Sequence, residues 1–184
     1  MSSDVSQKAG LGVFRSMKYI LIALISLLAL PAMAAYDQYV PQAEKVGQGR
    51  LTYLMWDVYD ASLYAPEGRY EADRPFALRL SYLRNIPAEK IVERSIAEMA
   101  EQAGIDQSRL SEWEARLFAF FPEITKGDEV IGVNDGQGTS LFYYNGTRVG
   151  MIDDPDFTRS FFDIWLGSDT NVPDLQRKIL GKAR

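Results

Sequence analysis

The spacing of hydrophobic and polar residues divides much of the chain into strand and helix segments. Between residues 76 and 82, Phe76, Leu78, Leu80 and Tyr82 alternate with small or polar residues, which predicts a strand with one buried face. Other segments rich in β-branched and aromatic residues are also expected to be strands, namely 50–55, 58–64, 128–133, 140–144 and 147–152.

The region of the two expected strands at 50–55 and 58–64 has apolar residues on both faces. Leu51, Tyr53 and Met55 fall on one face, and Leu54 and Trp56 fall on the other. Strands with two apolar faces usually lie in a sheet that is covered on both sides. We therefore expect this segment to be buried, with residues 35–44 as a polar lead-in.

Apolar residues recur every three or four positions in the remaining segments, which is typical of helices with one buried stripe. Helices are expected at about 87–103, 107–121, 155–166 and 173–180. Asp153, Asp154 and Asp156 lie at the start of the third helix, and we interpret them as capping residues rather than as a cation site. No metal site is predicted, because no calcium-loop spacing is present.

The order of the elements indicates the fold class. Asn145-Gly146 is the strongest short hairpin signal, because a type I′ turn needs positive φ at both central positions. Strands and helices occur in separate groups, which predicts an α+β fold with a mostly antiparallel sheet and helices on one face. There is no regular βα alternation and no glycine-rich phosphate loop, so a nucleotide-binding fold is disfavoured.

The first 34 residues have the pattern of a secretory signal peptide. Basic residues precede an uncharged run at 19–30, which is shorter than the roughly 20 residues of a membrane span. Ala32-Met33-Ala34 then provides a small-x-small cleavage site. We predict a signal peptide at 1–34, with Met17 as an alternative start, and one domain at 35–184. The predicted location is the periplasm, without stable membrane insertion after cleavage. The alternative is an uncleaved anchor.

Composition excludes several kinds of chemistry. The 184 residues contain no His and no Cys, which excludes Ser-His-Asp catalysis, Cys-His catalysis and His- or thiolate-ligated metals. The net charge of −5 argues against nucleic acid as a partner, because contacts of basic residues with phosphates supply most of the affinity for nucleic acids. We expect no cofactor.

Six stretches resemble the chalcone-isomerase-like family of exported bacterial proteins. They span about residues 44–181 and comprise Tyr59–Tyr64, Phe76–Tyr82, Phe121–Ile124 with Gly127-Asp128, Phe142–Gly146, Phe161–Gly167, and Pro173–Leu175 with Ile179–Gly181. The resemblance implies an open-faced β-sandwich with a layer of helices and a pocket between sheet and helices. Plant members with this fold cyclise chalcones or bind fatty acids.

The resemblance also implies two site residues. The plant isomerase uses an arginine after a Gly-x-Gly-like segment, and Arg50 follows Gly47-Gln48-Gly49. The family's threonine position falls at Tyr59, where the threonine is missing. An Arg50–Tyr59 pair is similar to the pair that holds a carboxylate in fatty-acid-binding members. A guanidinium fork matches a carboxylate, and a phenol adds one donor.

Three functional hypotheses follow. The first is a periplasmic module that binds a small apolar or carboxylate-bearing ligand, with a fatty acid as an example and Arg50 as the anchor. The second is an isomerase of chalcone–flavanone type, in which Arg50 and Tyr59 stabilise a developing phenolate or enolate. The third is an envelope interaction protein whose pocket is filled by Trp56, Trp113 and Phe side chains; its protein partner is unknown.

Overall fold

The computed structural model describes residues 36–102 and 104–182. The expected signal peptide and its cleavage position lie outside these residues. Among the described residues, no helix is long and apolar enough to cross a membrane.

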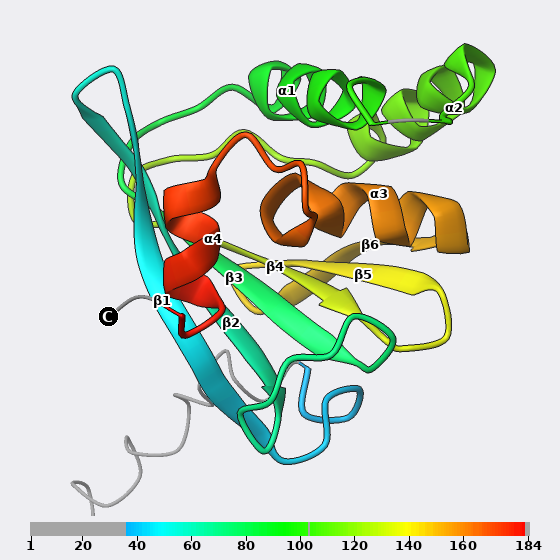
Figure 1. Cartoon of the computed structure of the whole chain (residues 1–184). Helices are drawn as coiled ribbons and strands as arrows, with labels where there is room; N and C mark the ends of the chain where they lie inside the picture. Colours follow the sequence, from blue (N-terminus) through cyan, green and yellow to red (C-terminus); the bar gives the residue numbers. More distant parts are fainter. Residues whose placement is uncertain (1–35, 103, 183–184) are drawn as a thin grey trace, which may run out of the picture. The chain divides into compact units, whose positions relative to one another are not determined.

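Within the described residues, six antiparallel strands form one sheet in which neighbours in sequence are also neighbours in space (Figure 1). The strands are β1 (Ala43–Tyr53), β2 (Trp56–Pro66), β3 (Phe76–Tyr82), β4 (Glu129–Asn134), β5 (Thr139–Tyr144) and β6 (Thr147–Asp153). Asn145 and Gly146 form the β5–β6 turn with φ values of 46° and 81°, as predicted for this dipeptide.

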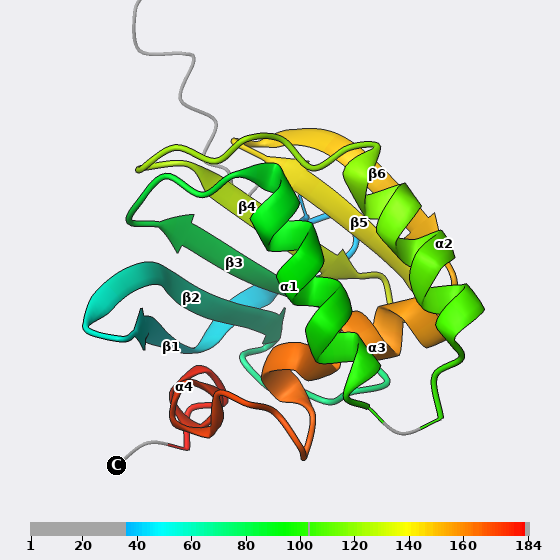
Figure 2. The same ribbon diagram turned by 90° about the horizontal axis from the view of Figure 1, so that it is seen from above.

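Four helices accompany the sheet in the part of the chain that the structure describes. They are α1 (Ala88–Ala100), α2 (Gln107–Phe118), α3 (Pro155–Leu166) and α4 (Pro173–Ile179). Figure 2 shows α1, α2 and α3 over one face of the sheet, while α4 lies beside β1. The α+β class and the open-faced arrangement predicted from the sequence are confirmed.

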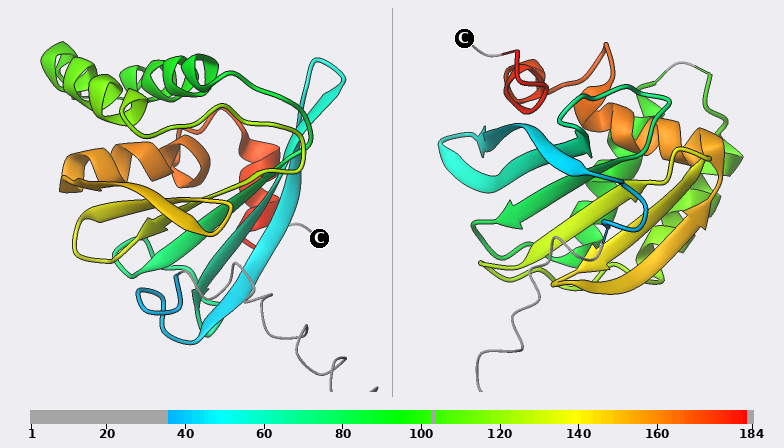
Figure 3. Two further views of the ribbon diagram at one scale, coloured as in Figure 1. Left: turned by 180° about the vertical axis from the view of Figure 1, so that it is seen from behind. Right: turned by 90° about the horizontal axis from the view of Figure 1, so that it is seen from below.

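The two faces of the sheet carry separate hydrophobic clusters. The larger cluster lies on the face under the helices, here called the inner face, and includes Leu63, Leu78 and Phe142. The smaller cluster lies on the opposite, outer face, where Tyr36 and Val40 are fully buried. Figure 3 shows the chain that precedes β1, in blue, lying against this outer face.

The expectation of a polar lead-in at residues 35–44 is therefore wrong. Tyr36 packs its ring 5.7 Å from that of Tyr64, between ring centroids, and β1 already begins at Ala43. The sequence pattern hid this segment because its buried residues are separated by exposed Asp37 and Gln38 and show no regular period.

The expectation that the apolar segment around Leu54 is buried is also wrong. Tyr53, Leu54, Met55 and Trp56 are exposed by 62%, 74%, 93% and 62%. These residues form the tip of the β1–β2 hairpin, beyond Tyr59, the first residue of β2 with a partner on β3. A strand pattern cannot distinguish a doubly covered strand from a projecting apolar tip.

Two glycines allow α4 to lie close to β1. A Cβ atom at Gly47 would come within 2.3 Å of the Lys178 carbonyl oxygen, and one at Gly49 within 2.8 Å of the Lys178 Cβ. The Gly-x-Gly segment before Arg50 thus has a packing role in this protein. Close backbone approach is a general use of glycine.

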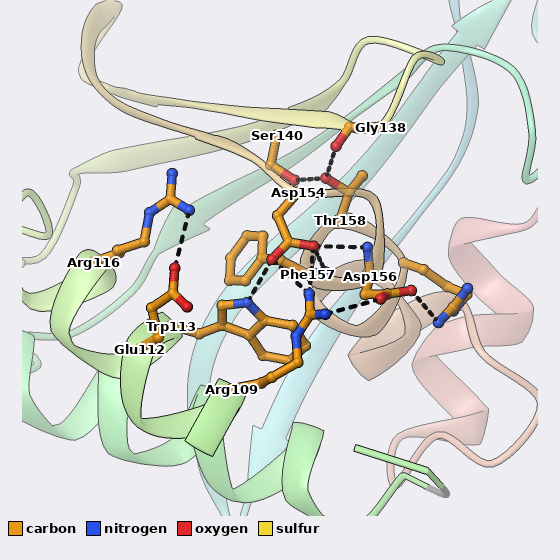
Figure 4. A network of polar contacts seen from close by, with 11 residues as sticks. Arg109, Glu112, Trp113, Arg116, Gly138, Ser140, Asp154, Asp156, Phe157 and Thr158 are labelled. Carbon is orange, nitrogen blue, oxygen red and sulfur yellow. Dashed lines mark hydrogen bonds and ion pairs between the residues drawn. The ribbon is translucent and has the colours of Figure 1, made fainter. Parts of the chain in front are cut away.

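A hydrogen-bond network around Asp154 joins α2 to the start of α3 (Figure 4). The Asp154 carboxylate accepts hydrogen bonds from Trp113 Nε1 at 2.9 Å, from Arg109 at 2.8 Å and from the backbone N–H groups of Asp156 and Phe157. Its side chain is only 14% exposed. The interpretation of Asp154 as a helix cap is confirmed.

The pKa of Asp154 lies below its ordinary value. Burial alone would raise this pKa, but the hydrogen bonds from Trp113 and the Phe157 backbone and the charge of Arg109 outweigh it. Because the folded pKa is below the unfolded one, ionised Asp154 stabilises the fold above the ordinary Asp pKa of about 3.9. This contribution is lost as the pH falls through the folded pKa.

We expect Asp154→Ala to lower the free energy of unfolding by about 2 kcal/mol at neutral pH, because it removes a cap and leaves the buried Trp113 N–H unpaired. Urea denaturation followed by circular dichroism measures this change. The difference from the wild type should shrink below about pH 4. The control is Asp156→Ala, at a half-exposed position; equal losses for both variants would contradict the role of Asp154.

Candidate functional site

A cavity of about 560 Å³ lies between the inner face of the sheet and helices α1 and α3. Its floor is formed by residues of β2, β3, β4 and β5, including Leu78, Leu80, Val130 and Phe142. The alternation along these strands predicts such a floor, because every second side chain points to the same face. The cavity size falls within the roughly 300–1,000 Å³ of small-molecule sites.

Most of the cavity lining is apolar. Aromatic side chains of α3 cover one side, and aliphatic side chains from β1, α1 and the segment before α1 complete the wall. The main apolar lining residues outside the floor are Leu51, Val58, Ile86, Ile91, Phe121, Phe161, Phe162, Ile164, Trp165 and Val172. Trp56 and Trp113 do not line the cavity, so they do not fill it as the third hypothesis expected.

Tyr59 lines the cavity and is fixed by a hydrogen bond. Its hydroxyl oxygen accepts a 2.8 Å hydrogen bond from Trp165 Nε1, which joins β2 to α3. Burial raises the pKa of Tyr59 to about 12, although the hydrogen bond from Trp165 opposes the rise. The phenol therefore stays neutral near pH 7, and its own proton remains available for an acceptor in the cavity.

Tyr82 supplies a second phenol beside the first. Its ring centroid lies 5.7 Å from that of Tyr59, and burial raises its pKa well above the ordinary value. Within the part of the chain that the structure describes, no group forms a hydrogen bond with the Tyr82 hydroxyl. Both phenols lie among the aromatic side chains that line the cavity.

Two cations on α1 also line the cavity. Lys90 and Arg94 have side chains exposed by 62% and 65%, so their charged groups remain in contact with water at the rim. Lys90 pairs with Glu93 at 2.7 Å, and Arg94 pairs with Glu98. The side chain of Glu98 is only 9% exposed and lines the same cavity.

The structure does not bring Arg50 and Tyr59 together. Arg50 pairs with Asp60 across β1 and β2, whereas Leu51 pairs with Tyr59, so Arg50 and Tyr59 point to opposite faces of the sheet. The guanidinium donates to Asp60 at 2.7 and 2.9 Å and to Asp57 at 2.8 Å. These contacts satisfy it on the outer face, away from the cavity.

The pair implied by the resemblance is thus not formed, because adjacent positions on a strand face opposite ways. Tyr59 lines the cavity as expected of a ligand-binding residue, while Arg50 is a half-exposed member of an ion-pair cluster. Ligand binding by either residue stays a prediction.

A second hollow of about 560 Å³ lies over α1, α2 and α3 and has a mostly polar lining. Glu98, Arg109, Asp156 and Asp163 contribute to it. No group of three or more acidic residues within the described ranges is arranged to hold a metal ion. This hollow lacks the apolar lining that distinguishes the cavity under the helices.

The chalcone isomerase-like family matches residues 46–181, a range that begins within β1 and includes β2–β6 and all four helices α1–α4. The chain belongs to this family. No curated protein sequence matches the chain significantly.

Among solved structures of this fold is the fatty-acid binding protein of Arabidopsis thaliana. It superimposes on this member of the chalcone isomerase-like family with a TM-score of 0.60 and 15% sequence identity. The alignment covers 77% of this chain and 88% of the plant protein. At this identity the likeness establishes the shared fold.

The sequence analysis did not single out Tyr82, Lys90 and Arg94, which are among the polar residues that line the cavity. The alternation at 76–82 correctly predicts that Tyr82 lies on the buried face of its strand, but it does not indicate that the hydroxyl lacks a hydrogen-bond partner among the described residues. Lys90 and Arg94 lie one helical turn apart, and this i, i+4 spacing could have indicated two cations on one edge of α1. Only the structure shows that this edge faces the cavity.

Tyr59→Phe and Tyr82→Phe form a matched pair that tests the cavity geometry. Tyr59→Phe leaves the buried Trp165 N–H without its acceptor and should cost about 1–2 kcal/mol of unfolding free energy. Tyr82→Phe breaks no such bond and should cost less than about 0.5 kcal/mol. Chemical denaturation measures both, and a larger loss for Tyr82→Phe would contradict this arrangement.

Proposed function

We propose that this protein binds an apolar carboxylic acid of the fatty-acid type in the cavity, without converting it, after export to the periplasm. The observation that carries the proposal is the cavity of about 560 Å³, lined by aromatic and aliphatic side chains and only a few polar groups. Such a lining favours a hydrocarbon chain, since burial of apolar surface supplies about 25 cal/mol per Å².

The polar groups suggest how the ligand lies. An ionised carboxylate is costly to bury, so it is best placed at the rim, where Lys90 and Arg94 are in contact with water. The hydrocarbon chain then extends over Leu80 and Val130. The phenols of Tyr59 and Tyr82 offer hydrogen-bond donors to a polar substituent or a water molecule inside.

The comparison supports the same class of ligand. The Arabidopsis protein of this fold is described as a fatty-acid binding protein. Export is supported by the signal-peptide pattern of residues 1–34. Binding without conversion is favoured over the isomerase hypothesis because Arg50, the expected catalytic partner of Tyr59, lies on the other face.

Blocking the cavity should abolish binding. Leu80→Trp places an indole on the cavity floor, and we expect the affinity for oleate to fall at least tenfold in isothermal titration calorimetry. Met151→Trp is the matched control, because Met151 is 53% exposed and pairs with Leu141 of the outer cluster. Absence of oleate binding by the wild type, or equal affinity of a folded Leu80→Trp protein, would reject the proposal.

The rim cations should distinguish acids from neutral analogues. Replacing Lys90 and Arg94 together by Gln should weaken binding of oleate about threefold to tenfold, because two exposed charge interactions are lost. The affinity for oleyl alcohol should stay unchanged. Arg177→Gln, which removes an ion-paired cation on α4 outside the cavity, should alter neither value. Equal weakening for the acid and the alcohol would place the carboxylate elsewhere.

A further inference from the structure

The tip of the β1–β2 hairpin combines exposed apolar side chains with a strained backbone. We define the tip as Tyr53–Trp56, whose four side chains are each at least 62% exposed. No large hydrophobic residue elsewhere in the described chain is as exposed; the next are Met151 at 53% and Phe118 at 44%. Such a concentration at one point of a surface marks an interaction site.

The backbone conformation of the turn does not favour the large side chains that the turn carries. Leu54 and Met55 have φ values of 49° and 82°, in the left-handed region that disfavours bulky side chains. The β5–β6 turn adopts positive φ at the same two positions with Asn145 and Gly146, which suit it. The protein thus tolerates strain at one turn that it avoids at the other, and retained strain often indicates a functional constraint.

The hairpin also leads directly to the cavity. Leu51, Thr52 and Tyr53 line the cavity, so its wall is continuous with the tip. The side chains of Leu54 and Met55 do not line it. An apolar molecule entering or leaving along this edge would meet the tip first.

We propose that the hairpin tip inserts into the surface of a lipid bilayer, so that the apolar ligand passes between the bilayer and the cavity. This inference rests on the proposed function, because it supplies the route by which a poorly soluble acid reaches the site. The tip has the composition of interfacial anchors, with Leu54 and Met55 at its apex flanked by Tyr53 and Trp56.

The surrounding cations fit a membrane surface. The Arg84 guanidinium carbon lies 5.1 Å from the centroid of the Trp56 ring. Lys90 and Arg94 lie on the rim of the cavity, which Tyr53 of the tip also lines. Lipid phosphates attract such groups at the level of the headgroups. A protein partner or a second copy fits less well, because a stable protein interface needs roughly 20–30 residues a side, while the tip offers four.

The test replaces the turn by the sequence that its geometry prefers. Leu54→Asn combined with Met55→Gly removes both apex side chains, suits the positive φ values and leaves the cavity lining intact. The variant hairpin is therefore expected to stay folded, so that a loss of membrane binding reports on the two side chains. Met151→Ser removes an exposed apolar side chain from β6, at the opposite edge of the sheet, as the matched control.

Binding is measured with phosphatidylcholine vesicles that contain phosphatidylglycerol. We expect the partition coefficient of the Leu54→Asn/Met55→Gly protein to fall at least about tenfold, with Met151→Ser unchanged. Trp56 reports insertion, because the other two Trp residues, Trp113 and Trp165, are only 1% and 7% exposed. Its emission should be quenched by lipids brominated near the headgroup. All proteins carry the same N-terminus, so residues 1–35 contribute equally.

The same variant separates this inference from the proposed function. Its affinity for oleate in vesicle-free solution should stay within twofold of the wild type, while transfer of oleate from vesicles becomes slower. Equal vesicle binding by variant and wild type, no quenching of Trp56, or turn-dependent dimerisation without vesicle binding would overturn the membrane role. Failure of oleate binding in solution would instead overturn the proposed function, and the transfer role with it.

Discussion

The alternation of side chains along β1, β2 and β3 determines which residues line the cavity. Each strand presents one residue inward and the next outward, and the antiparallel register carries this choice from strand to strand. Tyr59 and Leu51 share the inner face, so Asp60 and Arg50 share the outer one. A shift of one residue in this register would exchange the cavity lining for the ion-pair cluster.

This constraint explains which features could be predicted from the sequence. The strand at 76–82 and the Asn145-Gly146 turn were recognised because their patterns are local, as was the Asp154 cap. Whether Arg50 and Tyr59 lie on the same face depends on the register of the β1–β2 hairpin, which has an irregularity between Leu51 and Thr52. The spacing of residues in the sequence does not predict this register. The strand pattern places Tyr82 on the correct face. Whether its hydroxyl can donate a hydrogen bond into the cavity depends on how the neighbouring helices and strands pack, which the pattern does not contain.

Two turns of the same sheet differ in how well their residues suit the backbone conformation. In the β5–β6 turn the residues match the backbone, and the surface there is polar. In the β1–β2 turn the backbone has the same sign of φ, but the side chains are long and apolar. An interpretation that equates hydrophobic residues with buried ones assigns these four residues to the core. Hydrophobicity alone does not show whether a side chain packs inside the protein or stays exposed on its surface.

The buried segment before β1 has a consequence for where the folded unit begins. Tyr36 and Val40 are fully covered, and they shield Ile131 and Leu141 on the outer face. The family match starts only at residue 46, within β1. A chain trimmed to the matched residues would lose the cover of the outer cluster and the first three residues of a sheet edge. Domain limits taken from similarity alone therefore fall inside the cooperative unit, and a cloned fragment should retain residue 36 onward.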